Sequence, residues 1–301
     1  MSGPSSTRGL FLIALAAVSW GTTGTATTFL VRDTALSPLV IGVARLALAA
    51  LVLAGLARRR GPLAIARGDV APVIAMGACM AVFQAGYFSA VVLVGVALTA
   101  LIAICAAPLI IALLAWLVLR ERLSPRGGIA LAVGVTGTAL LITGSQGVGA
   151  GGAARFAGGV ALALAASVGY ATYVVIAKRS LARSAPLPLA AATFAAGTVW
   201  LAPALLLIET SMPQLARGWP LLLYLGVVTT GLAYAAYTTG LARTSAAAAG
   251  IVALLEPLTA TLLGVALFGE RFGALGLIGA VLLLGAVALL VREETAERPT
   301  G

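Results

Sequence analysis

Long stretches without charged residues constrain this chain more than any other feature of its sequence. Residues 70–119 contain no Asp, Glu, Lys or Arg, and further apolar runs follow one another along the 301-residue chain. Of all residues 61% are hydrophobic and only 9% are charged, whereas soluble domains carry about 25% charged residues. A helix that spans a bilayer needs about 20 mostly apolar residues. The pattern therefore predicts an integral membrane protein.

The runs between charged residues predict ten transmembrane helices. Residues 70–119 are long enough for two spans, with a break expected near Val94-Gly95. Runs such as residues 109–119 are apolar throughout, whereas the strands of a membrane β-barrel alternate apolar and polar residues. The predicted fold class is therefore all-α. The expected spans are residues 9–31, 34–57, 70–94, 95–119, 127–143, 156–177, 186–208, 218–242, 244–269 and 272–291.

The distribution of basic residues predicts the orientation of these spans. If the N-terminus is inside, the inside segments hold 14 of the 19 Lys and Arg residues, the outside segments hold 4, and Arg45 lies within a span. An excess of Lys and Arg marks the cytoplasmic side of a membrane protein. Both termini are therefore predicted to be cytoplasmic. The four outside residues are Arg32, Arg155, Arg217 and Arg271.

Several function classes are disfavoured by what the sequence lacks. There is no histidine, the commonest general base and metal ligand, and Cys79 and Cys105 lie in apolar runs without CxxC spacing. The chain has no nucleophile–base constellation and no Walker A motif, so we expect neither an enzyme nor an ATPase, and no metal or cofactor. The net charge of +10 is scattered between apolar runs rather than gathered on one face, which argues against nucleic-acid binding.

An internal repeat appears at an offset of 149 residues. The pattern P-x12-E-R-x4-G occurs once in each half, and each half contains five expected spans. Because five is odd, the halves must cross the membrane in opposite orientations. Inverted repeats are typical of secondary transporters, whose substrate site lies near the midplane between the halves. We take residues 9–143 and 156–292 as the two repeats and residues 144–155 as a Gly-rich connector. The matched pairs are Pro108 and Pro257, Glu121 and Glu270, Arg122 and Arg271, and Gly127 and Gly276.

The repeated motif, Ser19-Trp20-Gly21 in the first span, Arg45 in the second and residues 255–271 in the ninth resemble the drug/metabolite transporter superfamily, in particular its EamA-type ten-helix branch. The resemblance implies an inverted 5+5 bundle with a central cavity of alternating access and with the last helix of each half at the periphery. It implies a transporter of a bacterial inner membrane that exports small metabolites, with amino acids, including aromatic ones, as the expected substrates.

Alternatives to this function are an exporter of drugs, nucleosides or sugars, and a passive facilitator. In each case the partners are the lipid bilayer and a small molecule. We expect the chain to act as a monomer without an ATPase subunit.

Arg45 and Glu256 are the only charged residues well inside the expected spans. Ionisable groups at membrane depth face a polar interior or a cavity. Arg45 could hold a substrate carboxylate, and Glu256 could bind a substrate ammonium or carry a proton; alternatively both are structural. Arg45 lies about 10 Å and Glu256 about 20 Å below the outer ends of their spans, at about 1.5 Å per residue. A simple ion pair between them is therefore not expected.

Aromatic and polar residues recur at helical spacing on the first, third, sixth and eighth spans. Such a lining suits a zwitterion with an apolar side chain, although Trp and Tyr also form interfacial belts and Thr packs membrane helices. Pro108 and Pro257 each remove a backbone donor and are candidate hinges, or else static kinks. The candidate substrate-binding residues, besides Arg45 and Glu256, are Trp20, Gln84, Tyr87, Tyr170, Tyr173, Tyr234 and Tyr237.

Overall fold

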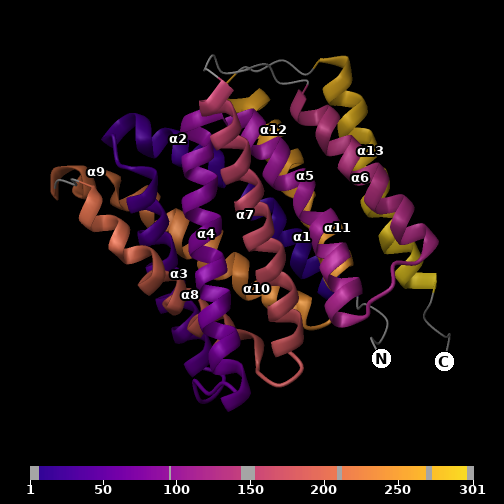
Figure 1. Ribbon diagram of the computed structural model, residues 1–301, viewed down its shortest axis with the longest axis horizontal. Coiled ribbons are helices and arrows are strands. Elements are labelled where there is room, and N and C mark those ends of the chain that lie inside the picture. Colours follow the sequence, from indigo (N-terminus) through magenta and orange to yellow (C-terminus); the bar gives the residue numbers. More distant parts are fainter. Residues whose placement is uncertain (1–6, 95, 144–152, 209–211, 269–272, 297–301) are drawn as a thin grey trace.

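The protein is a bundle of helices in the computed structural model, which describes residues 7–94, 96–143, 153–208, 212–268 and 273–296 (Figure 1). These residues contain no strand, and eight helices among them are long and apolar enough to cross a membrane. The all-α membrane fold predicted from the sequence is confirmed. Glu270-Arg271 and most of the connector 144–155 lie outside the described residues.

The first half supplies five of the ten expected spans, two of which contain irregular backbone. Residues 70–119 form two helices, α4 and α5, as expected, whereas Gly95 of the expected break at Val94-Gly95 lies outside the described residues. The elements are α1 (Thr7–Gly21), α2 (Thr23–Thr34), α3 (Pro38–Arg58), the 3₁₀ turn η1 (Arg67–Asp69), α4 (Val70–Val94), α5 (Val96–Leu114), the π-helical η2 (Ala115–Leu119) and α6 (Pro125–Thr143).

The second half supplies the other five spans. Of the ten, only α6 and the apolar part of α13, Ala274–Leu289, are not among the eight long apolar helices. The elements are α7 (Ala153–Ser180), α8 (Pro186–Leu201), the 3₁₀ segment η3 (Ala202–Leu207), α9 (Met212–Leu223), the π-helical η4 (Tyr224–Leu232), α10 (Ala233–Leu241), α11 (Ala246–Ala253), α12 (Leu255–Phe268) and α13 (Ala274–Ala296).

Helix contacts are repeated between the two halves. The 149-residue offset relates α4 to η4 and α10, and α7 to α1, and accordingly α4 packs against α7 while α1 packs against α10. In the same way α4 packs against α8 and η4 against α3, while α3 and α8 pack against each other. The last helices of the halves, α6 and α13, form a pair at the edge of the bundle, as the family resemblance implied (Figure 1). The main hydrophobic core lies between α1, α3, α4, α7, α8 and α10 and extends to α5, α6 and α11.

Small residues allow the closest of these helix contacts. A Cβ added to Gly77 of α4 would lie 2.7 Å from the backbone nitrogen of Gly197 in α8, so a side chain there would force the two helices apart. Close backbone approach at small residues is a general feature of membrane helix packing. The two halves are thus joined by direct backbone contact across this interface.

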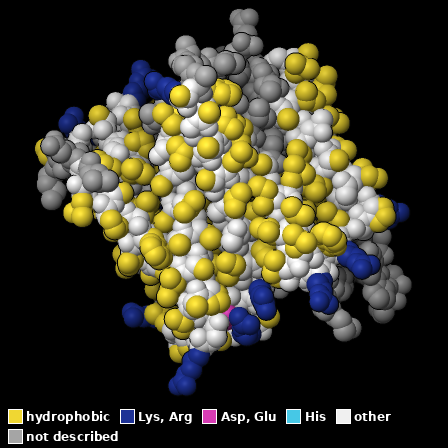
Figure 2. All heavy atoms as spheres, viewed as in Figure 1, with side chains coloured by type: hydrophobic (Ala, Val, Ile, Leu, Met, Phe, Trp, Pro, Cys, Tyr) yellow, Lys and Arg dark blue, Asp and Glu magenta, His cyan; other side chains and the backbone are white. Residues whose placement is uncertain are grey.

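Basic side chains gather on one edge of the bundle. Figure 2 shows most of the visible Lys and Arg side chains along the lower edge, while hydrophobic side chains cover the face between the two edges. α1 begins and α13 ends on that same lower side (Figure 1). The predicted cytoplasmic placement of this edge follows from the positive-inside rule and stays a prediction.

Candidate functional site

The helix of the first span, Thr7–Thr34, is interrupted near its middle. α1 ends at Gly21 and α2 begins at Thr23, so the break falls on Thr22. The Thr22 hydroxyl donates to the Ser19 carbonyl and accepts from the Tyr224 hydroxyl, both at 2.7 Å. Tyr224 begins the π-helical η4, and π-helical turns occur frequently at functional sites. The break therefore joins the first half to an irregular segment of the second.

A second break lies directly beside the first. α11 ends at Ala253 and α12 begins at Leu255, just before Glu256, because Pro257 cannot donate to the Ala253 carbonyl. A Cβ added to Gly21 would lie 2.7 Å from the carbonyl oxygen of Glu256, so only glycine permits this approach. Interrupted helices that meet near the midplane form the substrate sites of many secondary transporters.

Aromatic side chains from both halves surround Trp20 at these breaks. The ring centroid of Trp20 lies 4.9 Å from that of Tyr234, 5.1 Å from Tyr237 and 6.4 Å from Tyr170. Tyr173 continues the group at 6.1 Å from both Tyr170 and Tyr234. These distances fall in the favourable range for aromatic pairs. The structure thus brings together five of the aromatic residues that the sequence singled out.

Two phenylalanines that the sequence analysis left out complete the group. Phe83 of α4 lies 5.5 Å from Tyr170 and 5.9 Å from Tyr87, and so links Tyr87 to the rest. Phe194 of α8, which is fully buried, lies 4.6 Å from Tyr234. Phe194 is the counterpart of Arg45 at the 149-residue offset, and this relation could have identified Phe194 as a candidate site residue from the sequence. We call these eight residues the aromatic cluster: Trp20, Phe83, Tyr87, Tyr170, Tyr173, Phe194, Tyr234 and Tyr237.

Arg45 is buried and held in place by one edge of its guanidinium. Its Nε donates to Thr230 Oγ1 at 3.1 Å, and that hydroxyl in turn donates to the Leu225 carbonyl at 2.7 Å inside η4. No other hydrogen bond of this guanidinium is found among the described residues. The two terminal amino groups, which form the fork that pairs with carboxylates, therefore remain for a further partner.

Glu256 lies near Arg45 without pairing with it. Each is within electrostatic reach of the other and of Tyr87 and Tyr234, but no ion pair joins them in the part of the chain that the structure describes. The prediction that they do not form a simple pair is confirmed. Glu256 is also partly exposed. A cation from the first half and an anion from the second thus flank the aromatic cluster, and we call the cluster with these two residues the central site.

Several buried polar atoms around the first break have no hydrogen-bond partner within the described residues. Leaving a buried polar atom without a hydrogen-bond partner costs about 1–3 kcal/mol of stability. We therefore expect each of these atoms to bind a water molecule or a ligand. They come from the first span and from α7, the span that packs beside Phe83. The atoms are Ser19 Oγ, Trp20 Nε1, Thr23 Oγ1, Thr27 Oγ1 and Ser167 Oγ.

The remaining candidates lie around the central site rather than within it. Gln84 is buried against α3, where a Cβ on Gly42 would lie 3.5 Å from its Nε2, one helical turn from Arg45. The two prolines differ, because α5 continues through Pro108 whereas the ninth span is interrupted next to Pro257. The roles of all three residues stay predictions.

Comparison with known proteins identifies the family. The model of the EamA-like transporter family matches residues 7–143 and again residues 157–292. The chain belongs to the EamA-like transporter family. The two matches make this EamA chain a tandem repeat of two domains. Because the family is one of transporters, the function of the chain is transport across a membrane. The names of the family and of its relatives indicate a transporter and not an enzyme.

Relatives of this EamA transporter extend over most of its length. It is 33% identical over 292 residues to the "Uncharacterized transporter YwfM" of Bacillus subtilis, covering 95% of both chains. It is 29% identical over 208 residues to a "Probable terminal-alkyne amino-acid exporter" of Streptantibioticus cattleyicolor, covering 66% of each. A solved structure named only "Crystal structure of protein" superimposes with a TM-score of 0.82 at 23% identity, covering 98% of this chain and all of the other. That likeness shows the fold.

Proposed function

We propose that this EamA transporter exports amino acids, including aromatic ones, from the cytoplasm by alternating access. The observation that carries the proposal is that two residues of opposite charge, Arg45 and Glu256, flank the aromatic cluster from different halves without forming an ion pair with each other. The two terminal amino groups of the Arg45 guanidinium would bind the substrate carboxylate. Glu256 would accept hydrogen bonds from the substrate ammonium group. The rings around Trp20 would contact the apolar side chain.

The polar atoms around the first break support a ligand that carries hydrogen-bonding groups. Ser19, Trp20 and Thr23 present buried donors that an apolar drug would leave unsatisfied. A relative named a probable terminal-alkyne amino-acid exporter also supports an amino-acid substrate. Drugs, nucleosides and sugars lack the paired carboxylate and ammonium that Arg45 and Glu256 would bind together, so they are the weaker candidates.

The interrupted spans supply the moving parts in this proposal. Pro257 lies at the break of the ninth span, Thr22 at that of the first, and the two breaks touch through Gly21. Rocking of the halves about these breaks, with Pro108 as a further hinge, would expose the central site to each side in turn. We propose further that the chain acts as a monomer in a bacterial inner membrane, with both termini in the cytoplasm, as the excess of basic residues in the inside segments favours.

Uptake of labelled compounds into proteoliposomes tests the substrate class. The panel contains aromatic and aliphatic amino acids, their carboxamides, a nucleoside and a hexose. We expect transport of amino acids and little transport of the carboxamides, because these lack the group that Arg45 binds. Transport of the nucleoside or the hexose in preference to every amino acid would refute the proposal.

The driving force is tested in the same vesicles. If Glu256 carries a proton during the cycle, a pH gradient accelerates transport by the wild type but not by Glu256→Gln. A wild type that is indifferent to the gradient, or a Gln variant that keeps the full dependence, would show that Glu256 is not the proton carrier.

A further inference from the structure

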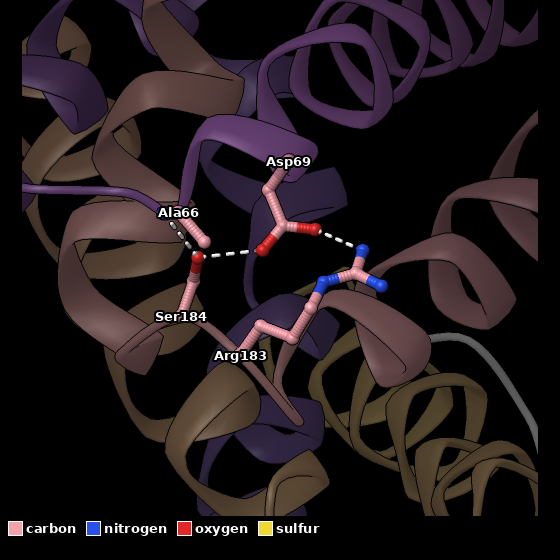
Figure 3. A network of polar contacts seen from close by, with 4 residues as sticks. All are labelled: Ala66, Asp69, Arg183 and Ser184. Atoms are coloured by element: carbon pink, nitrogen blue, oxygen red, sulfur yellow. Dashed lines mark hydrogen bonds and ion pairs between the residues drawn. The ribbon is translucent and has the colours of Figure 1, made fainter.

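A network of polar contacts joins two interhelical connections (Figure 3), which lie at the lower edge of the bundle (Figure 1). The Asp69 carboxylate, which is fully buried, accepts hydrogen bonds from the Arg183 guanidinium and, at 2.7 Å, from the Ser184 hydroxyl. The Ser184 oxygen also accepts from the backbone nitrogen of Ala66 at 3.0 Å. Both oxygens of the Asp69 carboxylate therefore accept a hydrogen bond, one from Arg183 and one from Ser184.

The network connects the two halves of the transporter. Ala66 and Asp69 belong to the connection between α3 and α4, and Arg183 and Ser184 to the connection between α7 and α8. Among the described residues it contains the only ion pair. Burying a carboxylate is costly unless it is paired and hydrogen-bonded. Asp69 therefore stabilises the contact between the two connections only while Arg183 and Ser184 remain in place.

The repeat relates this contact to another at the opposite end of the bundle. The 149-residue offset maps Asp69 onto Gly218 and Arg183 onto Thr34. These two positions also meet, because a Cβ on Gly218 would lie 3.3 Å from Thr34 Cγ2 and 3.0 Å from Leu36 Cδ1. The equivalent positions thus meet at both ends, through a charged network at one end and, at the other, through the close approach of Gly218 in α9 to uncharged side chains.

A second contact ties the halves together on the same side as the charged network. Glu121, between η2 and α6, accepts a hydrogen bond from the backbone nitrogen of Ala246 at 2.9 Å. Ala246 opens α11, where Ser245 caps the helix by accepting from Ala248 N. The lower edge therefore holds two carboxylates of the first half that bind groups of the second half.

We propose that the network of Asp69, Arg183 and Ser184 is the cytoplasmic gate of this transporter. It holds the lower ends of the halves together while the central site is open to the opposite side. It breaks when the halves separate to admit substrate from the cytoplasm. The proposal rests on the alternating access and the orientation given under the proposed function, but not on the identity of the substrate.

Cysteine accessibility tests the gate without any substrate. The background is the Cys79→Ala/Cys105→Ala chain, with Ala177→Cys as reporter. Ala177 is buried in α7, one turn before Ser180, which lies beside the Asp69 carboxylate. Inside-out vesicles are treated with a membrane-impermeant thiol reagent, and the rate of labelling is compared between gate variants and a control. Arg179→Gln is the matched control, because Arg179 is an exposed arginine at the same helix end.

We expect Asp69→Asn and Arg183→Gln each to accelerate labelling by about fivefold or more, the lower end of typical coupling between conformational states. Arg179→Gln should leave the rate unchanged. Asp69→Asn leaves no buried charge, so it tests the gate even if Arg183→Gln, which removes the cation beside a buried carboxylate, fails to fold. Unchanged labelling in Asp69→Asn would overturn the proposal, as would equal labelling from right-side-out vesicles. A failed amino-acid panel with accelerated labelling would refute only the substrate class.

Discussion

Replacing Arg45 by lysine tests how the central site recognises a carboxylate. In the structure Nε is held by Thr230, which leaves the terminal fork of the guanidinium for the substrate. Lysine keeps the charge but has one ammonium group, which cannot be held by Thr230 and also bind a carboxylate in bidentate fashion. The substrate therefore loses at least one hydrogen bond to a charged group. Such a bond contributes about 1.5–3 kcal/mol, which corresponds to about a 10- to 150-fold loss of affinity.

Binding of an amino acid and of its carboxamide to the purified protein measures this loss. Wild type should prefer the amino acid, Arg45→Lys should lose much of that preference, and Arg45→Met should lose all of it. Thr230→Val is the matched control, because it removes the anchor of Arg45 but keeps the guanidinium. If Arg45→Met folds and still prefers the amino acid as wild type does, Arg45 does not bind the carboxylate.

Three further predictions concern other parts of the chain. Trp20→Ala should abolish most transport while Trp116→Ala, at an exposed position on η2, should not, measured as uptake per folded protein. Burial raises the pKa of the Glu121 carboxyl, so the charged form is disfavoured in the fold and stability should increase as pH falls through this pKa. Glu121→Gln, which keeps a neutral acceptor for Ala246, should be at least as stable as wild type at pH 7, whereas Glu121→Ala, which leaves the Ala246 N–H without this acceptor, should lose about 1 kcal/mol in thermal unfolding. A single cysteine at Pro62 should resist impermeant reagents in intact cells, and rapid labelling there would contradict the topology.

The spans and most of the aromatic cluster could be predicted because their signals are local. Uncharged runs mark helices in a bilayer, and residues three or four apart share a helix face, so Tyr234 and Tyr237 were expected to act together. The repeat then related the first span to the sixth and the third to the eighth. This placed Trp20, Tyr87 and Tyr170 on helices that face the same axis.

The irregular backbone and the contacts between the halves could not be predicted, since they depend on residues far apart in the chain. Thr22 is not next to a proline, and its break is stabilised by Tyr224, 202 residues away. The π-helical η4 carries no sequence signal of its own, yet it provides Thr230, the anchor of Arg45. Asp69 is an ordinary helix-end carboxylate in the sequence, and only the fold brings it to Arg183, 114 residues away.

Counterflow in proteoliposomes tests the central claim most directly, namely that two halves carry an amino acid through a site that is never open to both sides. Vesicles are loaded with an excess of unlabelled amino acid and diluted into a trace of the labelled form. The account predicts a transient accumulation of label that exceeds equilibrium, with the carboxamide unable to replace the amino acid inside, and loss of the accumulation in Arg45→Met. Label that merely equilibrates at the same rate in loaded and empty vesicles would identify a passive channel and contradict the account.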